Sequence, residues 1–152
     1  MMVAAVRPAA PGPIVLGTDF GPVSAAAERA AIRVAAQRGA DLVIVHAIDS
    51  GTLRLPGGRW RERVDQARAG RERDAAFAVA RARAEGVAAR VLIWNGDPAT
   101  CLVEAAKAEG ADRIVVGSHG RGRIGRLIAG SVSASVVDQV ACPVDVVAAD
   151  PG

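Results

Sequence analysis

Aromatic residues are scarce in this sequence of 152 residues: phenylalanine and tryptophan occur twice each, and tyrosine does not occur. Single-stranded nucleic acids stack their bases on interleaved aromatic side chains, so this composition argues against a nucleic-acid partner. The net charge of +3 does not change that expectation, because 19 basic and 16 acidic residues are spread along the chain. Nearly all of the basic residues are arginine, a bias that a genome rich in G and C produces together with abundant alanine and glycine.

Long hydrophobic runs are missing as well. Nothing approaches 18 consecutive apolar residues, so no membrane-spanning helix is expected. The first residues lack the charged start and apolar centre of a signal peptide, and we therefore expect a cytoplasmic protein with no membrane partner. The two cysteines, Cys101 and Cys142, lie far apart and form no CxxC pair, which favours buried thiols in a reducing compartment over a disulfide or a metal site.

The order of the apolar segments predicts an α/β fold. Short runs rich in valine and isoleucine alternate with longer alanine-rich stretches of helical periodicity. Such alternation requires a parallel sheet with helices on both faces, joined by right-handed crossovers. We expect a flexible tail over residues 1–12 and one doubly wound domain over residues 13–149. The expected strands are 14–19, 42–48, 87–94, 112–117 and 144–148, and the expected helices are 24–38, 60–85, 98–110 and one starting at 131.

A glycine-rich segment between the fourth strand and the last helix carries the functional signal. Five glycines between positions 117 and 130 let the backbone turn sharply and approach a ligand. At Ser131 the segment reaches a helix N-terminus, whose free N–H groups and positive dipole end suit a phosphate. Arg121, Arg123 and Arg126 add positive charge. The alternative is a plain loop in which Ser131 only caps the helix.

Two common phosphate motifs fit this segment poorly. A Walker A loop needs GxxxxGK[ST], and the segment contains no lysine. Gly120 to Gly125 does satisfy GxGxxG, but a dinucleotide fold places this motif in an early βαβ unit, with the helix starting inside the motif. Here the helix begins some six residues later, close to the end of the chain. A dinucleotide oxidoreductase is therefore the third hypothesis.

The spacing Gly117-x2-Gly120-x9-Gly130-Ser131 is the pattern G-x2-G-x9-G-[ST]. It closely resembles the ATP-binding members of the universal stress protein family. The resemblance extends over roughly residues 13 to 149. It includes a first strand ending in Asp19, a second strand ending near Ala47, and a final strand after Cys142-Pro143.

What the resemblance implies can be placed on individual residues. The family's sheet order is 3-2-1-4-5, which is a Rossmann-like arrangement, and it puts the ends of strands one and four side by side. Asp19 would bind the ribose, the backbone of Ala47 would meet the adenine, and the start of the last helix would hold the phosphates, with Mg²⁺ bridging their oxygens. The complete set of nucleotide-binding residues implied is Gly17, Thr18, Asp19, Ala47, Val116, Gly117, His119, Gly120, Arg121, Gly130, Ser131, Val132 and Ser133.

Two of these residues, and the nearby His46, also have a plainer interpretation. Asp19 can cap the turn that follows it, His119 can be a surface loop residue, and His46 is interpreted as a hydrogen-bonded histidine of the core. No catalytic residue is identified. The sequence shows no water-activating base and no lysine for a γ-phosphate, so ATP hydrolysis is expected to be slow at most.

The resemblance also implies a homodimer formed through the last strand, Val144 to Ala148. Asp145 interrupts this otherwise apolar strand, and it either points to solvent, pairs with an arginine or weakens the dimer. The leading hypothesis is a regulatory or stress-response module that binds ATP with Mg²⁺. The alternatives are a nucleotide-free dimeric interaction protein and a module for another adenine nucleotide, cyclic AMP or AMP.

Overall fold

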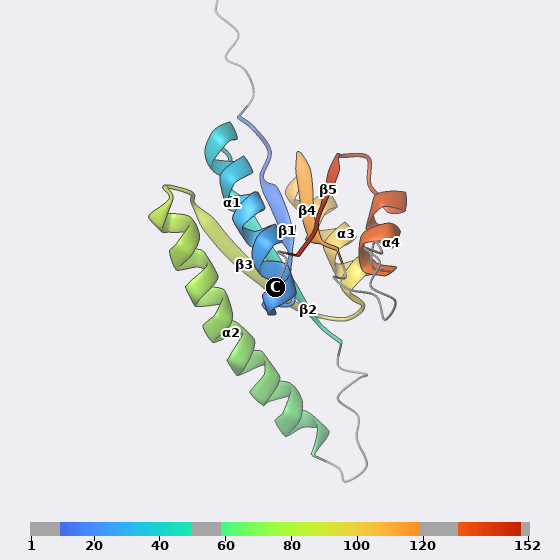
Figure 1. The fold of residues 1–152 in the computed structure, drawn as a ribbon. Helices are drawn as coiled ribbons and strands as arrows, with labels where there is room; N and C mark the ends of the chain where they lie inside the picture. The colour runs from blue at the N-terminus through green and yellow to red at the C-terminus, as the bar shows by residue number, and fades with distance from the viewer. Residues whose placement is uncertain (1–9, 50–58, 119–130, 150–152) are drawn as a thin grey trace, which may run out of the picture.

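The computed structural model describes residues 10–49, 59–118 and 131–149. Within these residues, strands and helices alternate along the chain as the sequence predicts (Figure 1). The elements are β1 (Ile14–Gly17), the 3-10 turn η1 (Pro22–Ser24), α1 (Ala25–Arg38), β2 (Leu42–Ile48), α2 (Trp60–Ala84), β3 (Ala89–Asn95), α3 (Pro98–Glu109), β4 (Arg113–Gly117), α4 (Ser131–Gln139) and β5 (Val144–Val147).

The strands form a single sheet in the order β3-β2-β1-β4-β5. Every neighbouring pair is parallel, which confirms the predicted fold class and strand order. The central strand β1 is covered on both faces, since Ile14, Val15 and Leu16 are fully buried. Such burial explains why its sequence is a continuous apolar run rather than an alternating one.

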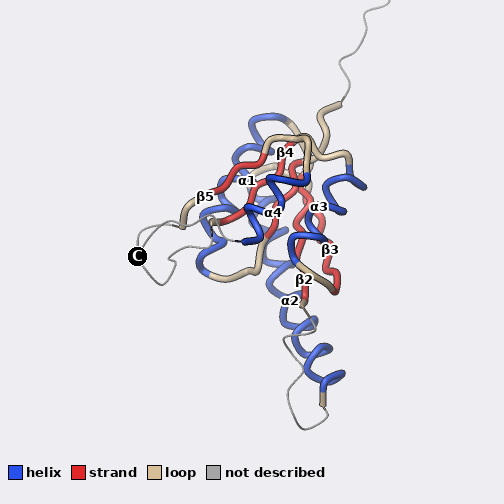
Figure 2. Tube along the Cα trace, turned by 90° about the vertical axis from the view of Figure 1, so that its right-hand side faces the viewer, coloured by secondary structure: helices blue, strands red, loops and turns tan. Residues whose placement is uncertain are grey.

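Helices cover both faces of this sheet. Ile14 and Leu16 pack with residues of α1 and α2 in one cluster, whereas Val15 packs with residues of α3 and α4 in the other. The division follows from the alternation of side chains along a strand. Figures 1 and 2 show the resulting layers, with α1 and α2 on one side of the sheet and α3 and α4 on the other. The buried face of α1 is mostly alanine, which brings the helix close to the strands.

The ends of the elements agree with the sequence at α3 and differ slightly elsewhere. Asp97 caps α3 by accepting a hydrogen bond from the Thr100 N–H at 2.9 Å, and Pro98 occupies the first turn. Strand β3 begins at Ala89 and not at the predicted Val87, because the Val87 N–H still donates to Ala82 in the closing turn of α2. Strand β5 ends at position 147 rather than 148, opposite the last residue of β4.

Helix α2 is longer than the sheet it covers. Its buried residues are Ala75, Ala78 and Ala82, all in the second half, and the first half extends past the rest of the described chain (Figure 2). Among the residues that the structure describes, no helix has the length and the apolar character needed to cross a membrane.

Candidate functional site

The chain leaves β1 and β4 toward opposite faces of the sheet. Strand β1 leads through η1 into α1 on one face, whereas the next helix after β4 is α4, which packs on the other. The two strands are neighbours, with Gly17 opposite Val116. A crevice therefore opens between their carboxyl ends, which is the place where open α/β sheets bind ligands.

A cavity of about 230 Å³ lies at these strand ends. Its walls combine the polar turn after β1 with apolar side chains of the strands and of helices α3 and α4, among them Val45, Pro98 and Leu102. Several residues that the sequence predicts to bind a nucleotide meet here. These are Gly17, Thr18, Asp19, Ala47, Val116, Gly117 and Val132.

The remaining predicted residues belong to the start of α4 or to the segment before it. Ser131 and Ser133 are in the first turn of α4, and Val132 lines the cavity, so the N-terminus of this helix borders the cavity. The first N–H groups of a helix have no partner within the helix and are free for a ligand. His119, Gly120, Arg121 and Gly130 lie outside the described residues.

Asp19 is fixed by hydrogen bonds within its own turn. Its Oδ1 accepts from the Gly21 N–H and from the Ser24 hydroxyl, both at 2.7 Å. Burial, the largest single influence, raises the pKa of Asp19, but the hydrogen bonds from Ser24 and Gly21, with smaller contributions from its own backbone and from His46, outweigh it, so the pKa lies below the usual value. Asp19 is therefore ionised at neutral pH and caps its turn, as its plainer interpretation predicts, while it also lines the cavity.

His46 has the environment predicted for a core histidine. It is buried in β2, and its Nδ1 lies 2.7 Å from the carbonyl oxygen of Thr18. Because a carbonyl only accepts, Nδ1 carries the proton and donates. Burial is the main cause that lowers the pKa of His46, so the ring is neutral at pH 7.

Ser118 is a cavity residue that the sequence analysis did not include. The residue is 3% exposed and lines the cavity, yet its hydroxyl has no hydrogen-bond partner among the described residues. A buried hydroxyl without a partner is costly and points to a ligand that would satisfy it. The available signal was its place in the motif, directly after the first glycine, but hydroxyl burial depends on the fold and cannot be read from spacing.

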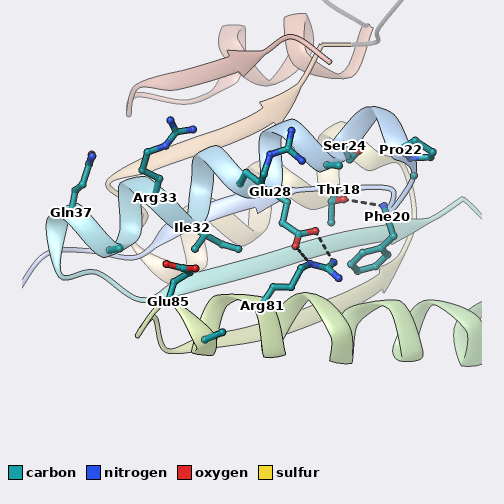
Figure 3. A pocket seen from close by; sticks show the side chains of 15 residues that line it. Thr18, Phe20, Pro22, Ser24, Glu28, Ile32, Arg33, Gln37, Arg81 and Glu85 are labelled. Atoms are coloured by element: carbon teal, nitrogen blue, oxygen red, sulfur yellow. Dashed lines mark hydrogen bonds and ion pairs between the residues drawn. The ribbon is translucent and has the colours of Figure 1, made fainter. Parts of the chain in front are cut away.

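A larger groove, of about 890 Å³, lies between α1 and α2 (Figure 3). At its floor Arg81 binds Glu28 with two hydrogen bonds, one of them from Nη2 to Oε2 at 3.0 Å. Glu28 is largely buried, whereas Arg81 is more than half exposed. Thr18 and Ser24 line both the groove and the cavity at the strand ends, so the turn after β1 separates the two spaces. No motif in the sequence indicates this groove.

These features define a Rossmann-like α/β protein with its candidate site at the topological switch point of the sheet. The sequence model of the universal stress protein family matches residues 12–148. The chain therefore belongs to the universal stress protein family.

Known proteins of this family are similar along most of the chain. A universal stress protein of Mycolicibacterium smegmatis is 38% identical over 137 residues, which is 89% of this chain and 45% of the relative. This chain thus spans about half the length of that protein. Among solved structures, a family member from Burkholderia pseudomallei is 29% identical with a TM-score of 0.74, covering 92% of this chain and 98% of that one.

A further solved structure is a universal stress protein in complex with cAMP. It is 28% identical to this chain, with a TM-score of 0.69, and the match covers 93% of this chain and all of the other.

Proposed function

We propose that the cavity at the ends of β1 and β4 binds an adenine nucleotide, and that ATP with Mg²⁺ is its ligand. The observation that carries this proposal is the meeting of Asp19 with Gly117, the first residue of the glycine motif, in one cavity at the switch point of the sheet. The solved relative in complex with cAMP supports the same class of ligand.

The size and walls of the cavity suit a base rather than an entire nucleotide. Small-molecule sites commonly measure about 300–1,000 Å³, so a cavity of about 230 Å³ encloses only part of such a ligand. The apolar side chains of Val45, Leu102 and Val116 offer flat contact to a ring. The backbone of Ala47, on the same wall, supplies hydrogen-bonding groups for its edge.

Asp19 and Ser118 would hold the sugar side. Oδ1 of Asp19 is engaged in its turn, and no hydrogen bond from a described residue reaches its Oδ2, which leaves this oxygen to accept from a ribose hydroxyl. The buried Ser118 hydroxyl lacks a partner within the same described residues. Both groups therefore fit a polyhydroxy ligand next to the base.

The phosphates would lie at the N-terminus of α4, near Ser131 and Ser133. His119, Gly120, Arg121 and Gly130 of the motif belong to the same proposed phosphate path. Mg²⁺, when bound with the nucleotide, neutralises phosphate charge. The protein's own contribution is a set of backbone N–H groups and hydroxyls that bind and orient the chain of phosphates.

Binding without efficient hydrolysis is the proposed activity, in keeping with a regulatory, stress-response role in the cytoplasm. Among the described residues that line the cavity, Asp19 is the only carboxylate, and its hydrogen bonds hold it in the turn. His46 also lines the cavity, but it is buried and its Nδ1 is bound to the Thr18 carbonyl. A water molecule beside the phosphates would need a general base within hydrogen-bonding reach. We therefore expect a slow ATPase at most.

We also propose a homodimer through the last strand. Strand β5 is an edge of the sheet, and edge strands carry backbone groups that can pair with another chain. Asp145 does not leave an unpaired charge there, because its Oδ1 lies 2.7 Å from Nη1 of Arg113 on the neighbouring strand. Sedimentation equilibrium tests the dimer, and a monomer at all concentrations would refute it.

Calorimetric titration with ATP and Mg²⁺ tests the binding site through two matched substitutions. Ala47→Phe puts a ring into the cavity at the strand ends, whereas Ala84→Phe puts the same ring beside the groove between α1 and α2. We expect about one nucleotide per chain for the wild type and for Ala84→Phe, and at least about tenfold weaker binding for Ala47→Phe because the base is excluded. Circular dichroism confirms that both variants fold.

Other results would redirect the proposal. Binding lost in Ala84→Phe and kept in Ala47→Phe would move the site to the groove. Tighter binding of cyclic AMP or AMP than of ATP would retain the site and change the ligand. No binding of any adenine nucleotide, after removal of co-purified nucleotide, together with a stable dimer would favour a nucleotide-free interaction protein.

A further inference from the structure

We infer that His46 is a positioning residue that holds the turn carrying Asp19 in its binding geometry. The inference rests on the proposed function, since it assigns His46 a role in that same site. The imidazole does not need to touch the nucleotide to act, because it contacts the turn on both sides of Asp19, at Thr18 and at Phe20.

The first contact extends the sheet by one residue. Strand β1 ends at Gly17, and the Thr18 N–H still donates to the Val45 carbonyl of β2 at 3.0 Å. The Thr18 carbonyl then accepts from Nδ1 of His46 at 2.7 Å. A side chain thus takes the place of the next backbone donor of β2, and both polar backbone groups of Thr18 are tied to that strand. Asp19 directly follows this fixed carbonyl in the chain.

The second contact supports an unfavourable backbone conformation. Phe20 has φ of 61°, in the left-handed region that bulky side chains rarely adopt. Its ring lies against the ring of His46, with centroids 5.1 Å apart, and its N–H donates to Oγ1 of Thr18 at 2.9 Å. Figure 3 shows this bond, with the Phe20 ring directed from the turn toward α2. Strained residues of this kind persist where their surroundings over-determine them.

The turn between these contacts is closed by its own hydrogen bonds. Gly21 and Ser24 both donate to Asp19, so the carboxylate moves with the turn as a unit. If His46 releases Thr18, the turn keeps its local bonds and the Thr18 N–H bond to Val45, but it loses the bond to the carbonyl that directly precedes Asp19. Asp19 would then point to the cavity in only a fraction of molecules. Affinity for a ligand that needs Asp19 falls in proportion to that fraction.

The ring of His46 is a donor that needs no charge to act. Burial lowers its pKa and Arg71 acts in the same direction, whereas the hydrogen bond to the Thr18 carbonyl, followed by Asp19 and Asp74, opposes the shift without cancelling it. At pH 7 the ring is therefore neutral, with its proton on Nδ1. An asparagine amide can present its N–H group at the position of Nδ1, whereas leucine fills similar space without a donor.

The test compares His46→Leu with His46→Asn by titration with ATP and Mg²⁺, and with cyclic AMP as a second probe. We expect about five- to tenfold weaker binding for His46→Leu, since it removes one hydrogen bond that the bound geometry needs. His46→Asn restores the affinity to within about twofold of the wild type. His46→Gln, whose amide reaches the position of Nε2 instead, groups with leucine.

A double-mutant cycle separates positioning from general loss of stability. In an Asp19→Ala background, His46→Leu should cause no further loss of affinity, because its effect passes through Asp19. Equal effects with and without Asp19 would overturn the inference, as would wild-type affinity in folded His46→Leu. The Asn and Gln pair provides the same contrast if the leucine variant fails to fold.

A ligand-free readout keeps this inference distinct from the proposed function. Nitrogen NMR of the wild type should show the Nδ1-protonated tautomer of His46 near neutral pH. The amide signals of Asp19 and Gly21 should shift in His46→Leu and much less in His46→Asn. The Nε2 tautomer would refute the positioning role even if ATP binds. Failure of the wild type to bind any nucleotide, with the expected tautomer present, would refute the proposed function alone.

Discussion

The two sides of the cavity at the strand ends differ in how their polar groups are satisfied. On the β1 side, the turn of Thr18 to Ser24 is closed by its own hydrogen bonds and tied to β2 by His46. On the β4 side, Ser118 follows the strand with a buried hydroxyl that no described residue contacts through a hydrogen bond. The β1 side is thus held mainly by its own hydrogen bonds, whereas on the β4 side the Ser118 hydroxyl has no hydrogen-bond partner among the described residues.

This difference separates polar groups that have partners within the protein from a group that a ligand would satisfy. Polar groups with protein partners stabilise the fold whether or not anything is bound. A buried group without a partner costs about 1–3 kcal/mol, and a ligand that hydrogen-bonds to it removes that cost. The contrast predicts that substitutions on the two sides differ in their effects on stability.

The largest effect is expected at the two glycines on which the strands end. A Cβ at Gly17 would meet Cδ2 of Leu102 at 2.8 Å, whereas a Cβ at Gly117 would find its nearest neighbour, the Val23 carbonyl oxygen, at 3.7 Å. We expect Gly17→Ala to lower the free energy of unfolding by about 1–3 kcal/mol, because a packed leucine must move. Gly117→Ala should change it by less than about 0.5 kcal/mol.

Urea denaturation measures the free energy of unfolding of both variants, and each variant serves as the control of the other. Nucleotide titration then completes the comparison. Gly117→Ala should fold as the wild type does, so any loss of its affinity reports on backbone approach to the ligand and not on the fold. Equal destabilisation by both substitutions would contradict the packing difference.

Smaller changes in stability, of opposite sign, are expected at two serines, one on each side of the cavity. Ser118→Ala removes a buried hydroxyl that has no partner among the described residues, and it should raise the free energy of unfolding by about 1 kcal/mol while it weakens nucleotide binding about five- to tenfold. Ser24→Ala removes the donor to Asp19 and should lower both stability and affinity. Thermal unfolding with and without ATP measures both quantities.

Loss of stability in ligand-free Ser118→Ala would mean that its hydroxyl has a partner in the protein. Unchanged affinity in a stabilised Ser118→Ala would remove this residue from the proposed site. Either result would end the contrast between the two sides of the cavity, whereas Ser24→Ala would still report on Asp19.

The fold was readable from the sequence because local signals and topology agree. The apolar run from Leu42 to Ile48 matches β2 residue for residue, and Asp97 with Pro98 marks the start of α3. The start of β3 was predicted two residues too early, because Val87 is apolar and follows Gly86 as the first residue of a strand would. Hydrogen bonding of the Val87 N–H, and not its residue type, decides where β3 begins.

The candidate site was readable only where a motif or a strand end marks it. Asp19 and Gly117 stand at such ends, so the topology brings them together. The burial of the Ser118 hydroxyl depends on the direction of its side chain. The contact of His46 with Thr18 joins residues that lie 28 positions apart in the chain. No spacing rule encodes those distances. The groove between α1 and α2 arises from the packing of two helices and has no motif at all.

The most direct test of the account is an NMR titration of the labelled protein with ATP and Mg²⁺. The account predicts saturable shifts of the amide signals of Gly17, Ala47, Val116 and Ser118, which line the cavity at the strand ends, and unchanged signals for Ala36 and Ala84 in the groove. Shifts confined to Ala36 and Ala84, or no shifts at millimolar nucleotide, would contradict it.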